Sequence, residues 1–129
     1  MGNYVFGKTV NLPFDEACRR VADALAGEGF GVLTEIDVAG TLKNKLGRDM
    51  PPYRILGACN PGYANRAISA EPQIGALLPC NVVVRQDADG ATHVEFMDPG
   101  AVMDLVGRPE VREIASEVRA RLVKVMNAV

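Results

Sequence analysis

The chain has 129 residues, of which 48% are hydrophobic and 23% are charged, and its formal net charge is −2. This length predicts one domain over residues 1–129, and the composition excludes a disordered chain. Because no basic cluster would attract a polyanion, we expect no nucleic-acid partner. No apolar run reaches the roughly 18 residues of a membrane span, so no membrane partner is expected either. Three cysteines without a signal-like N-terminus predict a reducing, cytoplasmic location.

The chain begins with a predicted strand and a long helix. Residues 4–11 favour a strand, which Pro13 ends. Apolar side chains then recur at the three-and-four spacing of one helical face as far as Gly27. Acidic residues in the first turn suit the positive end of the helix dipole.

Residues 30–38 alternate between apolar and polar side chains, which is the period of a half-buried strand. This alternation predicts that Val32, Ile36 and Val38 share one face. Residues 39–47 then predict a short polar helix or turn.

The centre of the chain predicts a strand followed by a short helix. Residues 53–59 are apolar enough for a strand buried on both faces. Pro61 is tolerated in the first turn of a helix, so a short helix should begin there and close before Pro72.

The last third predicts a hairpin and a second long helix. A strand at residues 80–86 and its antiparallel mate at residues 92–97 flank a turn whose Asp89-Gly90 pair provides the positive backbone angles of a tight reversal. An apolar stripe over residues 111–126 is the strongest helical periodicity in the chain.

Strands and helices are therefore mixed without regular alternation. This order predicts an α+β two-layer sandwich, in which a mainly antiparallel sheet carries the two long helices on one face. The short helices are inserted between the strands. The other face of the sheet should be covered by these short elements, by a second subunit or by a ligand.

Two Cys-Asn pairs are the most informative motifs. Cys59-Asn60 precedes Pro61, and Cys80-Asn81 follows Pro79, so each pair lies at a predicted strand end, where ligand sites often collect. The third cysteine, Cys18, lies on the apolar stripe of the first long helix and is interpreted as a core residue.

Neighbouring strands would bring Cys59 and Cys80 within reach of a disulfide, a shared metal ion, or a nucleophile with its resolving thiol. The alternative is that both are buried thiols whose asparagines only form turns. A zinc site would need His93 together with Asp37 or Asp98, and no metal-ligand spacing supports it. We therefore predict no metal site, and the sequence identifies no cofactor.

Cations and aromatic residues add weaker candidates. Lys43 and Lys45 are typical of a solvated turn, although they could also hold an anionic ligand over the sheet. Tyr53 and Tyr63 flank the Cys59 strand, where they could line a pocket or belong to the core.

Four segments give the chain a resemblance to the DUF302 family, a family of unknown function. They are residues 31–37, residues 45–47, residues 53–61 with both Cys59 and Asn60, and residues 77–84 with Cys80 and Asn81. The resemblance implies a small α+β domain from bacteria or archaea that forms a homodimer, and it implies no reaction. The positions to which it points are Asp37, Lys45, Cys59, Asn60, Pro61, Pro79, Cys80 and Asn81.

Three hypotheses follow for the function. The first is a small-molecule pocket with Cys59 and Cys80 at its floor, amide hydrogen bonds from Asn60 and Asn81, and an anionic ligand held by Lys45. The second is a thiol-dependent enzyme or redox protein, with Cys59 as nucleophile and Cys80 as resolving thiol. The third is a structural or dimerisation module in which the Cys-Asn pairs pack at a subunit interface.

Overall fold

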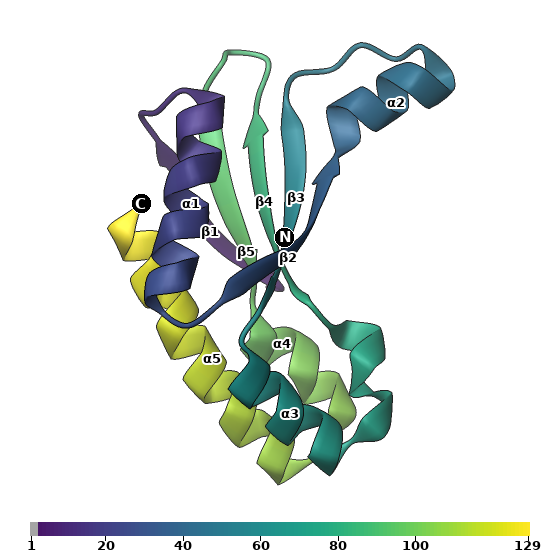
Figure 1. Ribbon diagram of the computed structural model, residues 1–129, viewed down its shortest axis with the longest axis vertical. Coiled ribbons are helices and arrows are strands. Elements are labelled where there is room, and N and C mark those ends of the chain that lie inside the picture. Colours follow the sequence, from purple (N-terminus) through teal and green to yellow (C-terminus); the bar gives the residue numbers. More distant parts are fainter. Residues whose placement is uncertain (1–2) are drawn as a thin grey trace.

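An antiparallel sheet forms one layer of the computed structural model, which describes residues 3–129 (Figure 1). Its five strands lie in the order β1-β5-β4-β3-β2, and each pairs antiparallel with its neighbours. The strands are β1 (Val5–Val10), β2 (Gly31–Asp37), β3 (Tyr53–Cys59), β4 (Cys80–Gln86) and β5 (Thr92–Met97).

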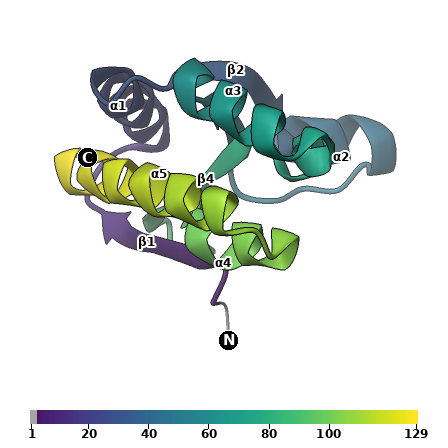
Figure 2. The ribbon, with the colours of Figure 1, turned by 90° about the horizontal axis from the view of Figure 1, so that it is seen from below.

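The second layer consists of the two long helices, α1 (Phe14–Gly27) and α5 (Pro109–Ala128), which lie on the same face of the sheet (Figure 2). This arrangement confirms the predicted α+β two-layer sandwich with a mainly antiparallel sheet. No helix within residues 3–129 combines the length and apolar composition needed to span a bilayer. The shorter elements are α2 (Val38–Leu46), α3 (Pro61–Ala70), α4 (Pro99–Met103) and the 3₁₀ turns η1 (Pro72–Leu77) and η2 (Asp104–Val106).

The core lies between the helices and one face of the sheet. Alternate residues of β4 and β5 are completely buried there, while the stripes predicted for α1 and α5 supply the opposing side chains. Burying each such aliphatic side chain contributes about 1.5 to 3 kcal/mol. The largest fully buried side chains include Phe96, Leu25, Ile74, Leu122, Val21, Val82, Val84 and Val94.

The prediction for the second strand is wrong about which side chains share a face. Val32 pairs with Ala58 and Thr34 pairs with Gly57, so Leu33 is an extra residue in a β-bulge. The inserted residue reverses the alternation beyond it, and Ile36 therefore lies on the opposite face from Val32. Ile36 is 48% exposed, and β2, which was expected to be half-buried, is mostly exposed at the edge of the sheet.

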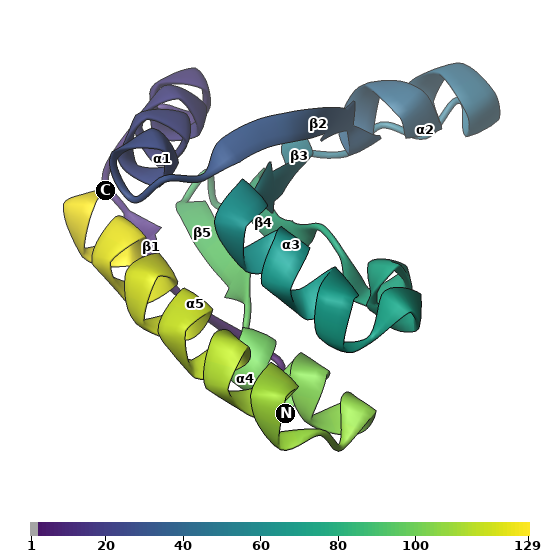
Figure 3. The same ribbon diagram turned by 60° about the horizontal axis from the view of Figure 1, so that its bottom comes forward.

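Val38, which was also predicted in that strand, begins helix α2 instead. The Asp37 side chain accepts a hydrogen bond from the Gly40 N–H (2.9 Å) and so caps the helix N-terminus. Helix α2 extends beyond the β2 edge of the sheet, away from α1 and α5 (Figure 3).

We predict that Gly7→Ala lowers the free energy of unfolding by about 2 kcal/mol, because a Cβ at Gly7 in β1 would overlap the Val94 carbonyl oxygen and the Glu95 Cα of the paired strand β5. Backbone atoms cannot move aside as a flexible side chain can. Urea denaturation measures the effect. Gly31→Ala in β2 is the matched control, because a Cβ there meets no atom within 4 Å. Equal stability of the two variants would contradict the close approach.

Candidate functional site

The pairing of β3 with β4 brings the two Cys-Asn motifs to the same end of the sheet. Cys59 is the last residue of β3, Cys80 is the first residue of β4, and Cys80 pairs with Ala58, the residue before Cys59. A cis peptide bond joins Leu78 to Pro79 at the start of β4. All three cysteines of the chain are free thiols.

Both sulfur-bearing side chains line a cavity of about 40 Å³ beyond this end of the sheet. Helix α3, the turn η1 and helix α4 surround it together with the N-terminal half of α5, and these elements form a helical cluster at the bottom of Figure 1. The lining of the cavity is almost entirely apolar. The residues that line it are Phe30, Ala58, Cys59, Asn60, Tyr63, Ala64, Ala67, Ile74, Leu78, Pro79, Cys80, Pro99, Met103, Val111, Ile114, Ala115 and Val118.

Cys80 is a neutral thiol in this environment. Its side chain is buried, with 7% of the residue exposed, and burial raises its pKa to about 11, while the neighbouring Cys59 contributes in the same direction. Cys59 is only half-buried. Cys18 lies elsewhere, in the core on α1, where burial also raises the pKa of its thiol despite the opposing effect of Arg54.

Asn60 connects the cavity to the turn between α1 and β2. It precedes α3 as the N-cap residue but does not cap the helix with its side chain, and its Nδ2 instead donates to the Glu28 carbonyl oxygen at 3.5 Å. The asparagine is half-buried. It therefore forms part of the rim of the cavity.

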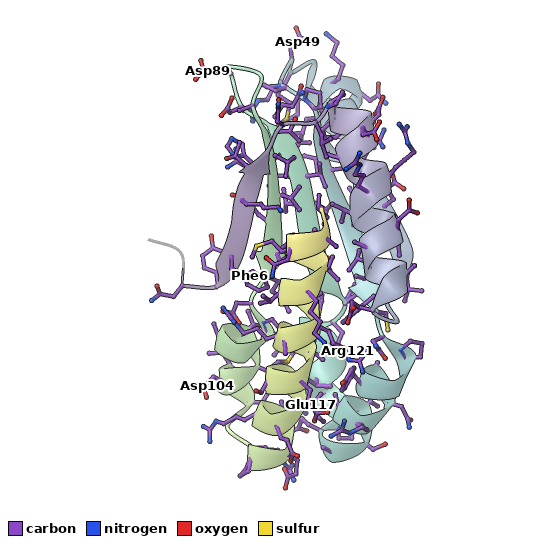
Figure 4. All side chains as sticks on the ribbon, turned by 90° about the vertical axis from the view of Figure 1, so that its left-hand side faces the viewer. Phe6, Asp49, Asp89, Asp104, Glu117 and Arg121 are labelled. Carbon is purple, nitrogen blue, oxygen red and sulfur yellow. The ribbon has the colours of Figure 1, made fainter. Side chains whose placement is uncertain are left out.

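The hydroxyl of Tyr63, a residue that lines the cavity, is bound by Arg121 of α5, which sequence reasoning missed. The Arg121 Nε donates to the Tyr63 hydroxyl at 3.0 Å, its Nη1 donates to the Glu28 carbonyl at 3.3 Å, and its guanidinium lies 5.5 Å from the centre of the Tyr63 ring. Figure 4 shows Arg121 projecting from α5 toward α3. Arg121 follows the buried Val118 by three residues on the predicted helix, so the two side chains lie on neighbouring positions of one face. This spacing is the sequence signal that could have identified Arg121.

The second asparagine lies on the other face of the sheet. Successive residues of a strand point to opposite faces, so the exposed Asn81 points away from the cavity that Cys80 lines. It lines a shallow groove of about 750 Å³ together with Tyr53, His93 and Glu95. The four side chains of the two Cys-Asn pairs therefore do not all reach the same pocket.

Asp37 and Lys45 lie apart from both hollows. Asp37 caps α2, Lys45 is exposed near the end of that helix, and neither lines the cavity or the groove. Of the candidates, Cys59, Asn60, Tyr63, Pro79 and Cys80 line the cavity, whereas Tyr53 and Asn81 line the groove. Within residues 3–129, no group of three or more His, Cys, Asp or Glu side chains is arranged to hold a metal ion.

Comparison with known proteins gives a consistent assignment. The model of the family described as "Domain of unknown function DUF302" matches residues 6–129. A crystal structure of an uncharacterised conserved DUF302 protein from Bacillus stearothermophilus is similar with a TM-score of 0.91 and 30% identity, over 98% of each chain. An uncharacterised protein of Aquifex aeolicus (strain VF5) is 24% identical over 91 residues, which are 70% of this chain and 57% of that protein.

The chain thus spans little more than half the length of the Aquifex protein, whereas it matches the Bacillus protein from end to end. The Cys-Asn segments that carried the resemblance lie within the matched region. The chain belongs to the DUF302 family.

Proposed function

We propose that this domain binds a small, mainly apolar molecule, or the apolar end of a larger one, in the cavity lined by Cys59 and Cys80. The observation that carries the proposal is the position of this cavity, because Cys59 and Cys80 both line it where β3 and β4 meet the helical cluster. Apolar hollows with a few polar groups at the rim are the usual form of small-molecule sites.

The lining favours an apolar ligand over the anionic ligand expected from the sequence. None of the described lining residues carries a charge, and Lys45, which was expected to hold the anion, lies on α2 and not at the cavity. An anionic group here would lose its hydration without gaining a cation in the cavity wall.

The size of the cavity limits what enters without movement. A cavity needs a volume of about 10 to 15 Å³ to hold one water molecule, so 40 Å³ is enough for a small guest only. A longer ligand would extend past the rim. There the Asn60 amide and the Tyr63 hydroxyl would orient its polar end.

The proposal predicts that xenon, an apolar probe, binds in the cavity. Dissolving xenon under pressure should produce saturable shifts of the methyl resonances of Ile74, Val111 and Ile114, because apolar cavities bind this gas. Ala67→Leu should abolish the shifts by filling the cavity.

The matched control is Ala120→Leu, the same change at an exposed position of α5. It should leave the xenon shifts intact. Shifts that survive Ala67→Leu, or a wild-type protein whose resonances do not respond, would refute the proposed site.

A thiol-redox function is the second candidate, because Cys59 and Cys80 line the same cavity and are both reduced. An external disulfide such as oxidised glutathione would take two electrons and two protons from the two thiols and leave as two thiols, with a Cys59–Cys80 disulfide as product. The raised pKa of Cys80 opposes this reading, since the thiolate is the attacking species and Cys80 would remain protonated at neutral pH.

The state of Cys80 predicts a pH-dependent stability. Below a pH of about 9 the thiol is protonated in both the folded and the unfolded chain, so it contributes its full stability. Between pH 9 and about 11 only the unfolded chain loses the proton, and the free energy of unfolding should fall by about 2 to 3 kcal/mol.

Urea denaturation of the wild type and of Cys80→Ala at pH 8 and pH 11 isolates this effect, because the other titrating groups cancel in the difference. The stability difference between the two proteins should shift in favour of Cys80→Ala at high pH. A difference that does not change with pH would mean that Cys80 ionises normally, and the redox candidate would then become the stronger one.

A further inference from the structure

Arg121, exposed on α5, is a cation whose protein partners are neutral oxygens. Its Nε donates to the Tyr63 hydroxyl and its Nη1 donates to the Glu28 carbonyl oxygen. In the part of the chain that the structure describes, Arg121 forms no ion pair, whereas its neighbour Arg66 is paired with Glu117 at 3.2 Å. The charge of Arg121 is therefore not compensated by a carboxylate of the domain.

The Glu28 carbonyl oxygen holds this cation close to the cavity. Asn60 lines the cavity, and its Nδ2 donates to the same oxygen at 3.5 Å. A Cβ added at Gly29 would lie 3.0 Å from that Nδ2, so the turn after α1 is packed against the amide. Arg121 thus shares an acceptor with one lining residue and binds the hydroxyl of another, Tyr63.

These three side chains, Asn60, Tyr63 and Arg121, are here called the donor cluster, because each retains donor capacity. A guanidinium has five N–H groups, and the structure shows hydrogen bonds from Nε and Nη1 only. A hydroxyl that accepts from Arg121 can still donate its own proton, and the Asn60 amide has a second N–H. The cluster can therefore offer one positive charge and several donors to an acceptor from outside the domain.

The Tyr63 ring is held in place by two cations. The guanidinium groups of Arg66 and Arg121 lie over it, at 5.6 and 5.5 Å from its centre. Arg66 is fixed in turn by two hydrogen bonds to Glu117, at 3.4 and 3.2 Å. Because these contacts exist without a ligand, the hydroxyl is already oriented and binding would cost little ordering of this side chain.

The exposure of the lining residues shows on which side of the cavity the donor cluster lies. The lining residues of α5 are all buried. Those that keep some exposure include four neighbours at the junction of β3 and α3, namely Cys59, Asn60, Tyr63 and Ala64. A guest that enters at this junction would have its inner end against apolar residues and its outer end beside the donor cluster.

We propose that the ligand is a short-chain monocarboxylic acid, with its hydrocarbon end in the cavity and its carboxylate at the donor cluster. This assignment rests on the function proposed above, that the cavity is a ligand site. The guanidinium fork matches the two oxygens of a carboxylate. One cation compensates one negative charge, whereas a phosphate dianion would keep a second charge without a partner. The cavity volume of about 40 Å³ restricts the hydrocarbon end to a short chain.

Titration of the full chain with sodium butyrate at constant ionic strength, followed through the methyl resonances of Ile74, Val111 and Ile114, tests this assignment. Butan-1-ol and butylammonium carry the same hydrocarbon chain with a neutral and a cationic head. Butyrate should bind about tenfold more tightly than butan-1-ol, because hydrogen bonds to a charged group are stronger than those between neutral groups. Butylammonium should bind most weakly, since Arg121 would repel it.

Arg121→Met removes the charge and keeps an apolar stem. It should lower the butyrate affinity about tenfold, to that of butan-1-ol, and leave the binding of butan-1-ol and xenon unchanged. Arg112→Met is the matched control, because Arg112 is also an exposed arginine of α5 and its partner is Asp104. It should not change the butyrate affinity.

Xenon separates this assignment from the proposal on which it rests, and it also verifies that Arg121→Met is folded. If xenon binds but butyrate binds no more tightly than butan-1-ol, or if Arg121→Met keeps the preference for butyrate, the carboxylate assignment is wrong and the cavity remains a ligand site. If neither xenon nor butyrate shifts the methyl resonances of the wild type, the cavity is not a ligand site and both proposals fail.

Discussion

The antiparallel pairing of β3 with β4 is the constraint on which the rest of the molecule depends. Because Cys80 pairs with Ala58, the end of one strand and the start of the next lie side by side, and both cysteines reach the same helical cluster. Because successive residues of a strand point to opposite faces, Cys80 points toward the helices and Asn81 points toward the face of the sheet away from α1 and α5. One pair of strands thereby places candidate surfaces on both sides of the sheet.

The two faces of the sheet differ in how they are stabilised. On the helical side, Val82, Val84, Val94 and Phe96 are completely buried, so hydrophobic burial dominates. On the opposite side, the Arg85–Glu95 pair is about one third exposed at both side chains, and ion pairs of this kind contribute little net stability in water. The pair fixes the positions of the Arg85 and Glu95 side chains on the sheet. The partly exposed apolar residues beside it would gain hydrophobic stabilisation if they were covered.

The sequence predicted the periodic features and missed those that depend on a single inserted residue or on distant contacts. The stripe over residues 111–126 became α5, and the Asp89-Gly90 turn joins β4 to β5, with Gly90 at φ 83°. The bulge at Leu33 could not be read from alternation, because an extra residue looks like a continued strand. The separation of Lys45 from the cysteines could not be predicted either, since it depends on the direction in which α2 leaves the sheet.

Cysteine at position 80 is explained by packing alone as well as by chemistry. A thiol is small and weakly polar, so it can line an apolar cavity without requiring a hydrogen-bond partner, whereas serine would bury a hydroxyl at a cost of about 1 to 3 kcal/mol. Cys59 is only half-buried, so a polar side chain at position 59 would not have to lose its contact with water. If the cavity needed only a small apolar wall, alanine or valine would serve at position 59 as well. Cys59 is therefore the better candidate for a chemical role, whereas the shape of the cavity is enough to explain Cys80.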